Sequence, residues 1–444
     1  MRKNRMAWLA KFWKRVTNSL RWLVPGLGIK RWIILILLGT TLLGVGLAIL
    51  LLDIYRTAPE TWWLPILSYA SLRIVSRPLR VIIFGGIGAG LIISGILGIN
   101  RSLLAPYRRP GKPVLDELAE HRRRERGPRI VTIGGGHGLA TLLRGLKSYS
   151  YNITAVVTVA DDGGSSGRLR LSHGIPPPGD IRNCLAALSN DEALMTQLFQ
   201  YRFSDGGTEL DGHPFGNLFI SALAEITGSF EEAVVESGRV LAVHGQVLPA
   251  TLRDVKLVAD IQPPYSISEV RIAGESTIPK FPGDVRRVWL EPSNPAAYPQ
   301  VIQAILAAEL IVIGPGSLFT SILPNLLVQD ITAAIQASRA LKIYVCNVAT
   351  EPGETEGFTC EDHLRVLNEH VGSDIFDIVV INNQFEGQLT PGTKWVKTVA
   401  ETESEYPFYR ANLVDEGRPW RHDSAKLAQA IMDLYQERTG PLVE

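Results

Sequence analysis

Two short apolar runs, each followed at once by glycines, constrain the fold of this chain more than any other feature. The first run, 129–133, leads into four glycines between 134 and 138. The second, 153–160, leads into Asp161, Asp162 and a turn of glycines and serines. Leucines between the two runs recur at the i, i+3, i+4, i+7 spacing of a helix with one apolar stripe. This order of strand, glycine turn, helix, strand and glycine turn predicts an α/β domain with a parallel sheet.

The glycine turns also indicate a ligand site, because α/β proteins bind ligands beyond the carboxyl ends of their parallel strands. Glycine has no Cβ, so its backbone approaches a phosphate closely, and a helix N-terminus favours an anion. The spacing departs from the G-x-G-x-x-G pattern of dinucleotide folds, since Leu139 stands at the third glycine position. An ordinary turn that binds nothing is the alternative, and the added acidic pair favours a nucleotide or sugar-nucleotide site.

Further along the chain, apolar strands alternate with helical segments, which predicts a mostly parallel sheet with helices on both faces. A third strand ends in a glycine turn at 314–317, and another ends at Asn347. Between 240 and 290 the pattern changes to short strands and turns, which predicts a β-rich insertion. No internal repeat or low-complexity tract is present.

The loop predicted at 168–182 contains three arginines and three consecutive prolines. Guanidinium groups suit phosphate oxygens, so we expect one of Arg168, Arg170 and Arg182 to contact a phosphate, while the others are solvated or paired with carboxylates. Asp180 is a plausible N-cap of the helix that follows the prolines. Asn217, at the entrance of a later helix, either binds a base or ribose or caps that helix.

The first 128 residues have a different character. Residues 1–32 combine nine lysines and arginines with tryptophan, leucine and phenylalanine, and contain no carboxylate, which is typical of a helix in a membrane interface. Residues 33–52 are uncharged and long enough to cross a bilayer, and a second such run covers 81–99. A cleaved signal peptide is disfavoured because the second span follows directly.

The arginines and lysines that flank these runs predict their orientation. Both the N-terminal flank and the segment 100–128 are basic, so both belong in the cytoplasm and the connector lies outside. The predicted organisation is a basic amphipathic segment 1–32, two transmembrane helices in 33–99, a basic cytoplasmic linker 100–128 and a cytoplasmic domain 129–444. The protein is therefore expected at the inner (plasma) membrane, crossing it twice and contacting the lipid bilayer through this hairpin.

Overall composition excludes some classes of protein. The formal net charge is +1, which argues against a nucleic-acid partner, since proteins that bind nucleic acid are normally basic. The three cysteines have no metal-ligand spacing and form no even disulfide set, which fits a reducing compartment.

Six segments resemble the bacterial gluconeogenesis factor (YvcK-type) family, which shares its fold superfamily with CofD, the 2-phospho-L-lactate transferase. They are GGGHGLATLLRGLK, TAVVTVADDGGSSGRLR, PPPGDIRNCLAALS, GHPFGNLFISAL, VIGPGSLFTSILPNLLV and YVCNVATEPGET. The resemblance covers 129 to the C-terminus and implies a Rossmann-like domain that binds a UDP-sugar such as UDP-N-acetylglucosamine. It also implies a regulatory role in cell shape and cell-wall synthesis. We further expect a homo-oligomer and a protein partner from envelope synthesis.

The motifs that carry the resemblance also imply which residues bind the ligand. The implied site comprises Gly134, Gly135, Gly136, His137, Gly138, Asp161, Asp162, Gly163, Gly164, Ser165, Ser166, Arg168, Gly179, Asp180, Arg182, Asn183, Asn217, Gly314, Pro315, Gly316, Ser317 and Asn347. Two positions depart from the family pattern: His137 stands where many relatives have Thr, and Glu351 where many have Gln.

Two further functions remain as alternatives. A CofD-type transferase would move a phosphorylated three-carbon acid to an acceptor, and the carboxylates of Asp161, Asp162 and Asp180 would then hold Mg²⁺ near Arg168. A nicotinamide oxidoreductase is less well supported, because the glycine spacing is unusual and no residue that handles a hydride stands out. A regulator that binds a UDP-sugar is the preferred interpretation.

Overall fold

A computed structural model of the chain describes residues 114–440, except 190–192, 205–209, 374 and 400–406, together with isolated residues between 37 and 93. The chain divides into two units, Met1–Arg122 and Arg123–Glu444. The predicted basic segment 1–32 and most of the predicted transmembrane hairpin 33–99 lie outside the described residues. Among the residues that are described, no single helix has the length and apolar character to span a membrane. The two helical stretches Leu318–Leu326 and Gln329–Ala337, bent by 73° at their junction, meet these criteria only when taken together.

The second unit is built on a sheet of seven strands, all parallel. In spatial order these are β10 (Phe408–Ala411), β9 (Ile378–Asn382), β8 (Leu341–Val345), β7 (Leu310–Ile313), β1 (Ile130–Gly134), β2 (Ile153–Val157) and β3 (Gln246–Pro249). The chain first runs outward from β1 to β3 and then outward from β7 to β10. This doubly wound order confirms the α/β, Rossmann-like part of the predicted fold class and has its switch point between β1 and β7.

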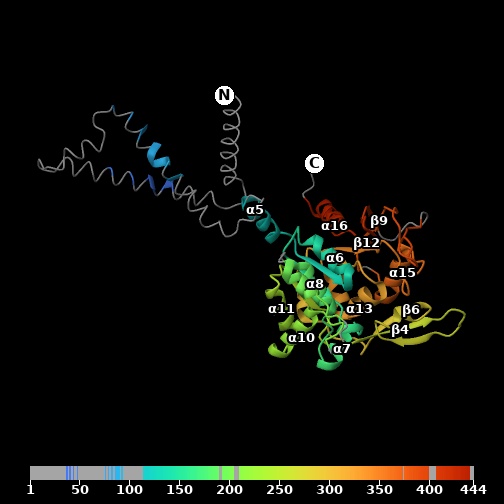
Figure 1. The fold of residues 1–444 in the computed structure, drawn as a ribbon. Helices are drawn as coiled ribbons and strands as arrows, with labels where there is room; N and C mark the ends of the chain where they lie inside the picture. The colour runs from blue at the N-terminus through green and yellow to red at the C-terminus, as the bar shows by residue number, and fades with distance from the viewer. Residues whose placement is uncertain are drawn as a thin grey trace. The chain divides into compact units, whose positions relative to one another are not determined.

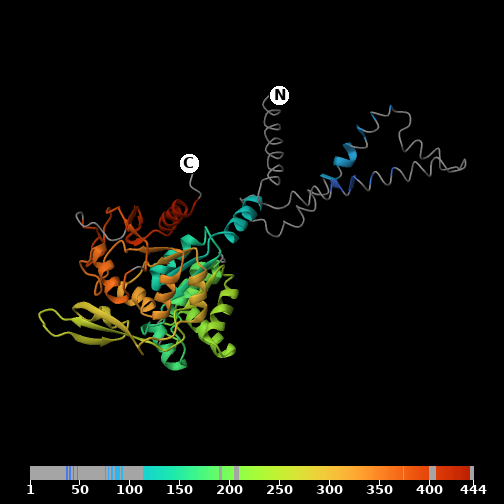
Figure 2. The ribbon, with the colours of Figure 1, turned by 180° about the vertical axis from the view of Figure 1, so that it is seen from behind.

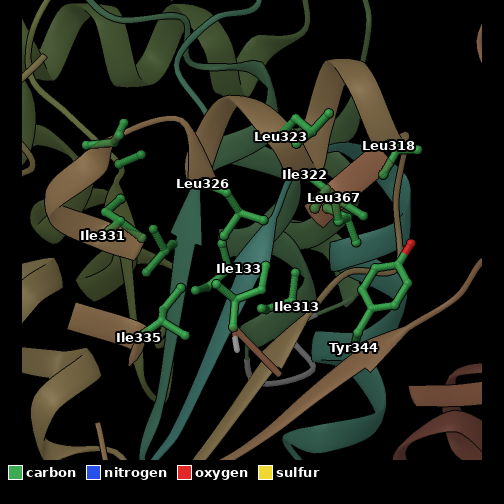
Figure 3. Close-up of a cluster of buried hydrophobic side chains, with 14 of the residues drawn as sticks. Ile133, Ile313, Leu318, Ile322, Leu323, Leu326, Ile331, Ile335, Tyr344 and Leu367 are labelled. Carbon is green, nitrogen blue, oxygen red and sulfur yellow. The ribbon is translucent and has the colours of Figure 1, made fainter. Parts of the chain in front are cut away.

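Side chains of the central strands alternate between two hydrophobic cores, as strand geometry requires. In β7, for example, Leu310 and Val312 enter one core while Ile311 and Ile313 enter the other. The core that contains Leu310 and Val312 is the first core. It is covered by α6 (Gly136–Leu146), α8 (Gly179–Leu188), α10 (Phe215–Thr227), α11 (Phe230–Val240) and α16 (Ser424–Thr439). The second is covered by α12 (Pro299–Ala307), η4 (Leu318–Ile322), α13 (Leu323–Leu326), α14 (Gln329–Ala337) and α15 (Cys360–Val371). Figure 3 shows Ile133 and Ile313 of the sheet among the apolar side chains of this second layer.

A separate antiparallel sheet confirms the predicted β-rich insertion. Its strands, in the order β5 (Val270–Ala273), β4 (Lys256–Gln262) and β6 (Asp284–Glu291), project from one side of the domain in both views, with the short helix η3 (Ile278–Lys280) before β6 (Figures 1 and 2). The insertion is shorter than predicted. Segment 246–249 is not part of the insertion, since it pairs in parallel with β2 and forms the edge of the main sheet. Burial of its Val247 and Leu248 in the two main cores stabilises this position.

The remaining elements differ locally from the sequence predictions. The predicted loop 168–182 begins as a helix, α7 (Gly164–His173), so the serines of the second glycine turn lie in its first turn. Helix α9 (Ala193–Gln200) follows α8, α5 (Val114–Glu125) precedes β1, and a small hairpin of β11 (Val414–Asp415) and β12 (Arg418–His422) precedes α16. Helix α8 has Pro178 at its N-cap, so the prediction that Asp180 caps this helix is wrong.

Candidate functional site

A cavity of about 520 Å³ opens at the carboxyl ends of β1, β7 and β8, where the strand order reverses. Its volume lies in the range of small-molecule sites. The loop after β1 (Gly135–Gly138), the loop after β7 (Pro315–Ser317) and the loop after β8 (347–352) form its floor. The insertion contributes Glu275, and the hairpin strand β12 contributes a further wall at 420–422.

The first and third glycine loops are in direct contact. A Cβ atom on Gly138 would lie 2.5 Å from the carbonyl oxygen of Pro315 and 3.0 Å from Cα of Gly316. Asn347, at the end of β8, fixes the third loop, because its Oδ1 accepts from the Gly316 N–H (3.1 Å) and its Nδ2 donates to the Gly316 carbonyl (2.9 Å). Three neighbouring strands thus hold one compact group of backbone turns.

Asp180 joins this group from α8. Its Oδ2 accepts a hydrogen bond from the Gly136 N–H at 2.7 Å, so its side chain is directed to the first glycine loop. Burial, and then the charge of Asp161, raise the pKa of Asp180 to about 6, while the bond from Gly136 opposes this shift. The carboxyl group therefore anchors the start of α6 from inside the cavity.

One end of the cavity is suited to an anion. The first-turn N–H groups of His137 and Gly138 have no acceptor within α6, and the helix dipole adds partial positive charge there. Arg421 of β12 is exposed, lines the cavity and has no hydrogen bond or ion pair among the described residues. Partial burial, and then the charges of Arg421, Arg144 and Arg182, lower the pKa of His137.

The cavity also contains acidic groups. Burial raises the pKa of Asp161, although its Oδ1 accepts from the Gly163 N–H (2.8 Å). Burial, and then the charges of Asp161 and Asp180, raise the pKa of Glu275 to about 8. Burial also raises the pKa of Glu351, while a bond from Ser317 opposes the shift. Glu354 lies behind this wall and accepts from the Phe319 N–H (3.2 Å) and the Thr320 hydroxyl (2.8 Å) at the start of η4.

The second glycine turn lies beside the cavity. The Ser165 hydroxyl bonds to Nδ1 of His213 (2.8 Å) and accepts from Nδ2 of Asn217 (3.0 Å). Arg168 donates to the carbonyl of Asp211 (2.7 Å), and the guanidinium of Arg170 binds Asp254. These contacts hold the turn and α7 against their surroundings.

Arg182 is buried and donates to Oδ1 of Asn183 (2.8 Å). Its Nε and the Oδ1 of Asn217 are buried polar atoms without a hydrogen-bond partner among the described residues. Burial, and then the nearby charge of Arg202, lower the pKa of Arg182 to about 10. No arginine of the segment 168–182 lines the cavity, whereas Arg421 does.

The structure divides the predicted site residues into two groups. Those that line the cavity are Gly135, Gly136, His137, Gly138, Asp161, Asp180, Pro315, Gly316, Ser317 and Asn347. Those that do not line it are Gly134, Asp162, Gly163, Gly164, Ser165, Ser166, Arg168, Gly179, Arg182, Asn183, Asn217 and Gly314.

Sequence reasoning missed several lining residues, among them Thr158, Glu275, Thr320, Ser321, Thr350, Trp420, Arg421 and His422. Asn347 was selected because ligands bind beyond the carboxyl ends of parallel strands, and the same reasoning applies to Thr350 in the same loop. Glu275 and the residues of β12 belong to no glycine turn, and no local pattern marks them.

The carboxyl groups of the described residues do not by themselves form a Mg²⁺ site. Four carboxyl groups line the cavity, those of Asp161, Asp180, Glu275 and Glu351, and the first two accept hydrogen bonds from backbone N–H groups. Within the described part of the chain, no three or more histidine, cysteine, aspartate or glutamate side chains are grouped so as to hold a metal ion.

Comparison with known proteins agrees with the fold and the motifs. Residues 130–430 match the family described as 2-phospho-L-lactate transferase CofD. A Nostoc sp. protein named "Putative gluconeogenesis factor" is 46% identical over 95% of this chain and 93% of its own length. The Bacillus subtilis "Gluconeogenesis factor" is 45% identical over 70% of this chain and 99% of its own length.

A solved structure gives the same result for the fold. The crystal structure of a UPF0052-family protein from Bacillus halodurans is 41% identical, with a TM-score of 0.64. The match covers 69% of the present chain and 99% of the Bacillus halodurans chain. The chain therefore belongs to the CofD family and, within it, to the gluconeogenesis factors.

Proposed function

We propose that this protein binds a UDP-sugar, with UDP-N-acetylglucosamine as the first candidate, and regulates cell shape and cell-wall synthesis from the cytoplasmic face of the membrane. The observation that carries the proposal is the anion-suited end of the cavity, formed by the N-terminus of α6 and Arg421 at the switch point of the sheet. A diphosphate needs this combination of backbone N–H groups, helix dipole and guanidinium.

The rest of the cavity supports a sugar nucleotide. Its lining includes Ser317, Asn347 and Thr350, whose hydroxyl and amide groups are of the kind that hydrogen-bond a sugar or base. The indole of Trp420 lines the wall beside Arg421 and offers an aromatic face for stacking. Backbone turns, neutral polar groups and one arginine thus lie in the same cavity as four carboxyl groups.

A regulator is favoured over the CofD-type transferase. The transferase would need groups that neutralise charge on a transferring phosphoryl, and the one arginine that lines the cavity among the described residues is Arg421. We also propose a protein partner from envelope synthesis and a homo-oligomer, which crosslinking and light scattering of the purified chain can test.

The membrane tether is proposed from the sequence. The uncharged runs 33–52 and 81–99 and the basic flanks place both termini in the cytoplasm. The Bacillus subtilis relative matches 319 residues over 99% of its length, whereas the Nostoc relative matches 445 residues, including most of the N-terminal part. The Bacillus subtilis relative thus matches only part of this chain along nearly its full length, which fits a tether added to a shared domain.

Thermal unfolding of the fragment 114–444 tests the ligand. Saturating UDP-N-acetylglucosamine should raise its stability, by about 2.7 kcal/mol at a hundredfold excess over Kd. Arg421→Ala should reduce this shift strongly because the diphosphate loses its cation. Arg418→Ala, an exposed arginine of the same strand, is the matched control and should leave it unchanged.

A shift produced by GDP or NAD but not by the UDP-sugar would rule out the ligand assignment. The same samples, incubated with UDP-sugar or a guanylylated three-carbon acid and Mg²⁺ and examined by mass spectrometry, separate regulator from transferase. A new covalent product formed by the wild type would establish the transferase instead.

A further inference from the structure

The insertion sheet reaches into the cavity at one residue, Glu275. This residue lies between β5 and η3, outside the seven-stranded sheet, and lines the cavity together with Asp161 and Asp180. The projecting sheet of Figures 1 and 2 is therefore connected to the ligand site by its own chain. An insertion that served only as a surface feature would not need to place a side chain there.

The segment that carries Glu275 is held firmly on both sides. The Ser276 N–H donates to Oδ1 of Asp162 at 2.9 Å, which joins the segment to the second glycine turn. The Gly274 N–H donates to the carbonyl of Leu257 in β4 at 2.8 Å. A Cβ on Gly274 would lie only 2.5 Å from Oδ2 of Asp162, so the two segments approach as closely as glycine allows. Asp162, which does not line the cavity, thus positions Glu275.

Glu275 differs from the carboxyl groups around it because it has no partner. The neighbouring acids Asp161, Asp162, Asp180 and Glu354 each accept at least one hydrogen bond from a backbone N–H. Among the described residues, the carboxyl group of Glu275 has neither a hydrogen bond nor an ion pair. The side chain is half-buried, so its hydrogen-bonding capacity is directed to whatever occupies the cavity.

The charges that face Glu275 determine its chemical form. Among the described residues these are the carboxyl groups of Asp161 in the loop after β2, Asp162 beside it, Asp180 on α8 and Glu354 before α15. Burial, and then these charges, raise the pKa of Glu275 to about 8, so that the group is protonated at neutral pH. A protonated carboxyl donates a hydrogen bond, whereas a carboxylate would repel a diphosphate.

We propose that Glu275 donates a hydrogen bond to an oxygen atom of the bound nucleotide sugar, which makes the insertion a specificity element of the site. This inference rests on the proposed function, since it takes the UDP-sugar as the ligand. Proton loss from Glu275 removes the donor and adds a negative charge beside the diphosphate. Binding therefore weakens as the pH rises through the titration of this one group.

Isothermal titration of the full chain in detergent with UDP-N-acetylglucosamine at pH 6.5 and pH 9 tests this contact. Wild-type affinity should fall by about tenfold between the two values, as expected for loss of one required proton one pH unit above its pKa. Glu275→Gln keeps a donor and no charge, so it should bind as the wild type does at pH 6.5 and change little at pH 9. Glu275→Ala should bind several-fold more weakly at pH 6.5.

The control is Glu269→Gln, an exposed glutamate of the same insertion, which should retain the wild-type affinity and pH dependence. Burial also raises the pKa of Glu354 to about 8, within this range, and that of Asp180 to about 6, just below it. The contact is therefore tested by the difference in pH dependence between wild type and Glu275→Gln. Equal pH dependence in these two proteins, or wild-type affinity of Glu275→Ala, would overturn the contact while leaving the ligand in place. Absence of binding by the wild type at both pH values would overturn the proposed function and the contact with it.

Discussion

At Gly138 the backbone of α6 passes so close to the loop after β7 that a methyl group would overlap the Pro315 carbonyl. Gly138→Ala should therefore push the two loops apart, cost about 1–3 kcal/mol of stability and weaken UDP-sugar binding. Gly238→Ala in α11 is the matched control, since a Cβ there makes only ordinary contacts at 3.6 Å and alanine favours a helix interior. Chemical denaturation and titration of both variants check this. Unchanged binding by Gly138→Ala would contradict the close packing of the loops.

At the scale of an element, α15 positions the loop after β8. Its N-terminus has a capping box, in which Thr359 Oγ1 accepts from the Asp362 N–H (3.2 Å) and Asp362 Oδ2 accepts from the Thr359 N–H (2.9 Å). Thr359→Ala should cost about 1 kcal/mol and also loosen the preceding loop, which carries Thr350 and Glu351 into the cavity. We therefore expect lower stability together with lower ligand affinity.

The comparison for this prediction is Ser229→Ala. Ser229 caps α11 through a bond from the Glu232 N–H (3.2 Å), and α11 does not line the cavity. This variant should lose a similar amount of stability without any change in affinity. If both cap variants bound ligand equally well, the loop would not depend on the start of α15. Denaturation midpoints and calorimetric titrations separate the two effects.

For the whole molecule, the prediction concerns the N-terminal 113 residues. The full chain should sediment with membranes, resist extraction by high salt and be released by detergent, because two uncharged runs of bilayer length precede the domain. The fragment 114–444 should remain in the supernatant and bind UDP-sugar with the affinity of the full chain, since its compact unit begins at Arg123. Release of the full chain by salt alone would argue for a surface association in place of a membrane-spanning hairpin.

More of the fold than of the candidate site could be predicted from the sequence. The central strands β1 and β7 are fully buried runs with a turn at their end, so 130–134 and 310–313 were identified from neighbouring residues alone. The strand 246–249 was assigned to the insertion, because only its pairing with β2 distinguishes it from the strands that follow. Asp180 was expected to cap α8, yet its side chain anchors Gly136, 44 positions earlier in the chain.

The sequence by itself determined the strand ends, the glycine loops beyond them and the alternation that makes a doubly wound domain, because period and turn chemistry are properties of adjacent residues. Only the tertiary structure decided which of these loops share a cavity, and that Glu275 of the insertion and Arg421 of β12 complete it. The physical reason is that the strand order brings β1 beside β7, so that segments far apart in the chain meet at one edge of the sheet.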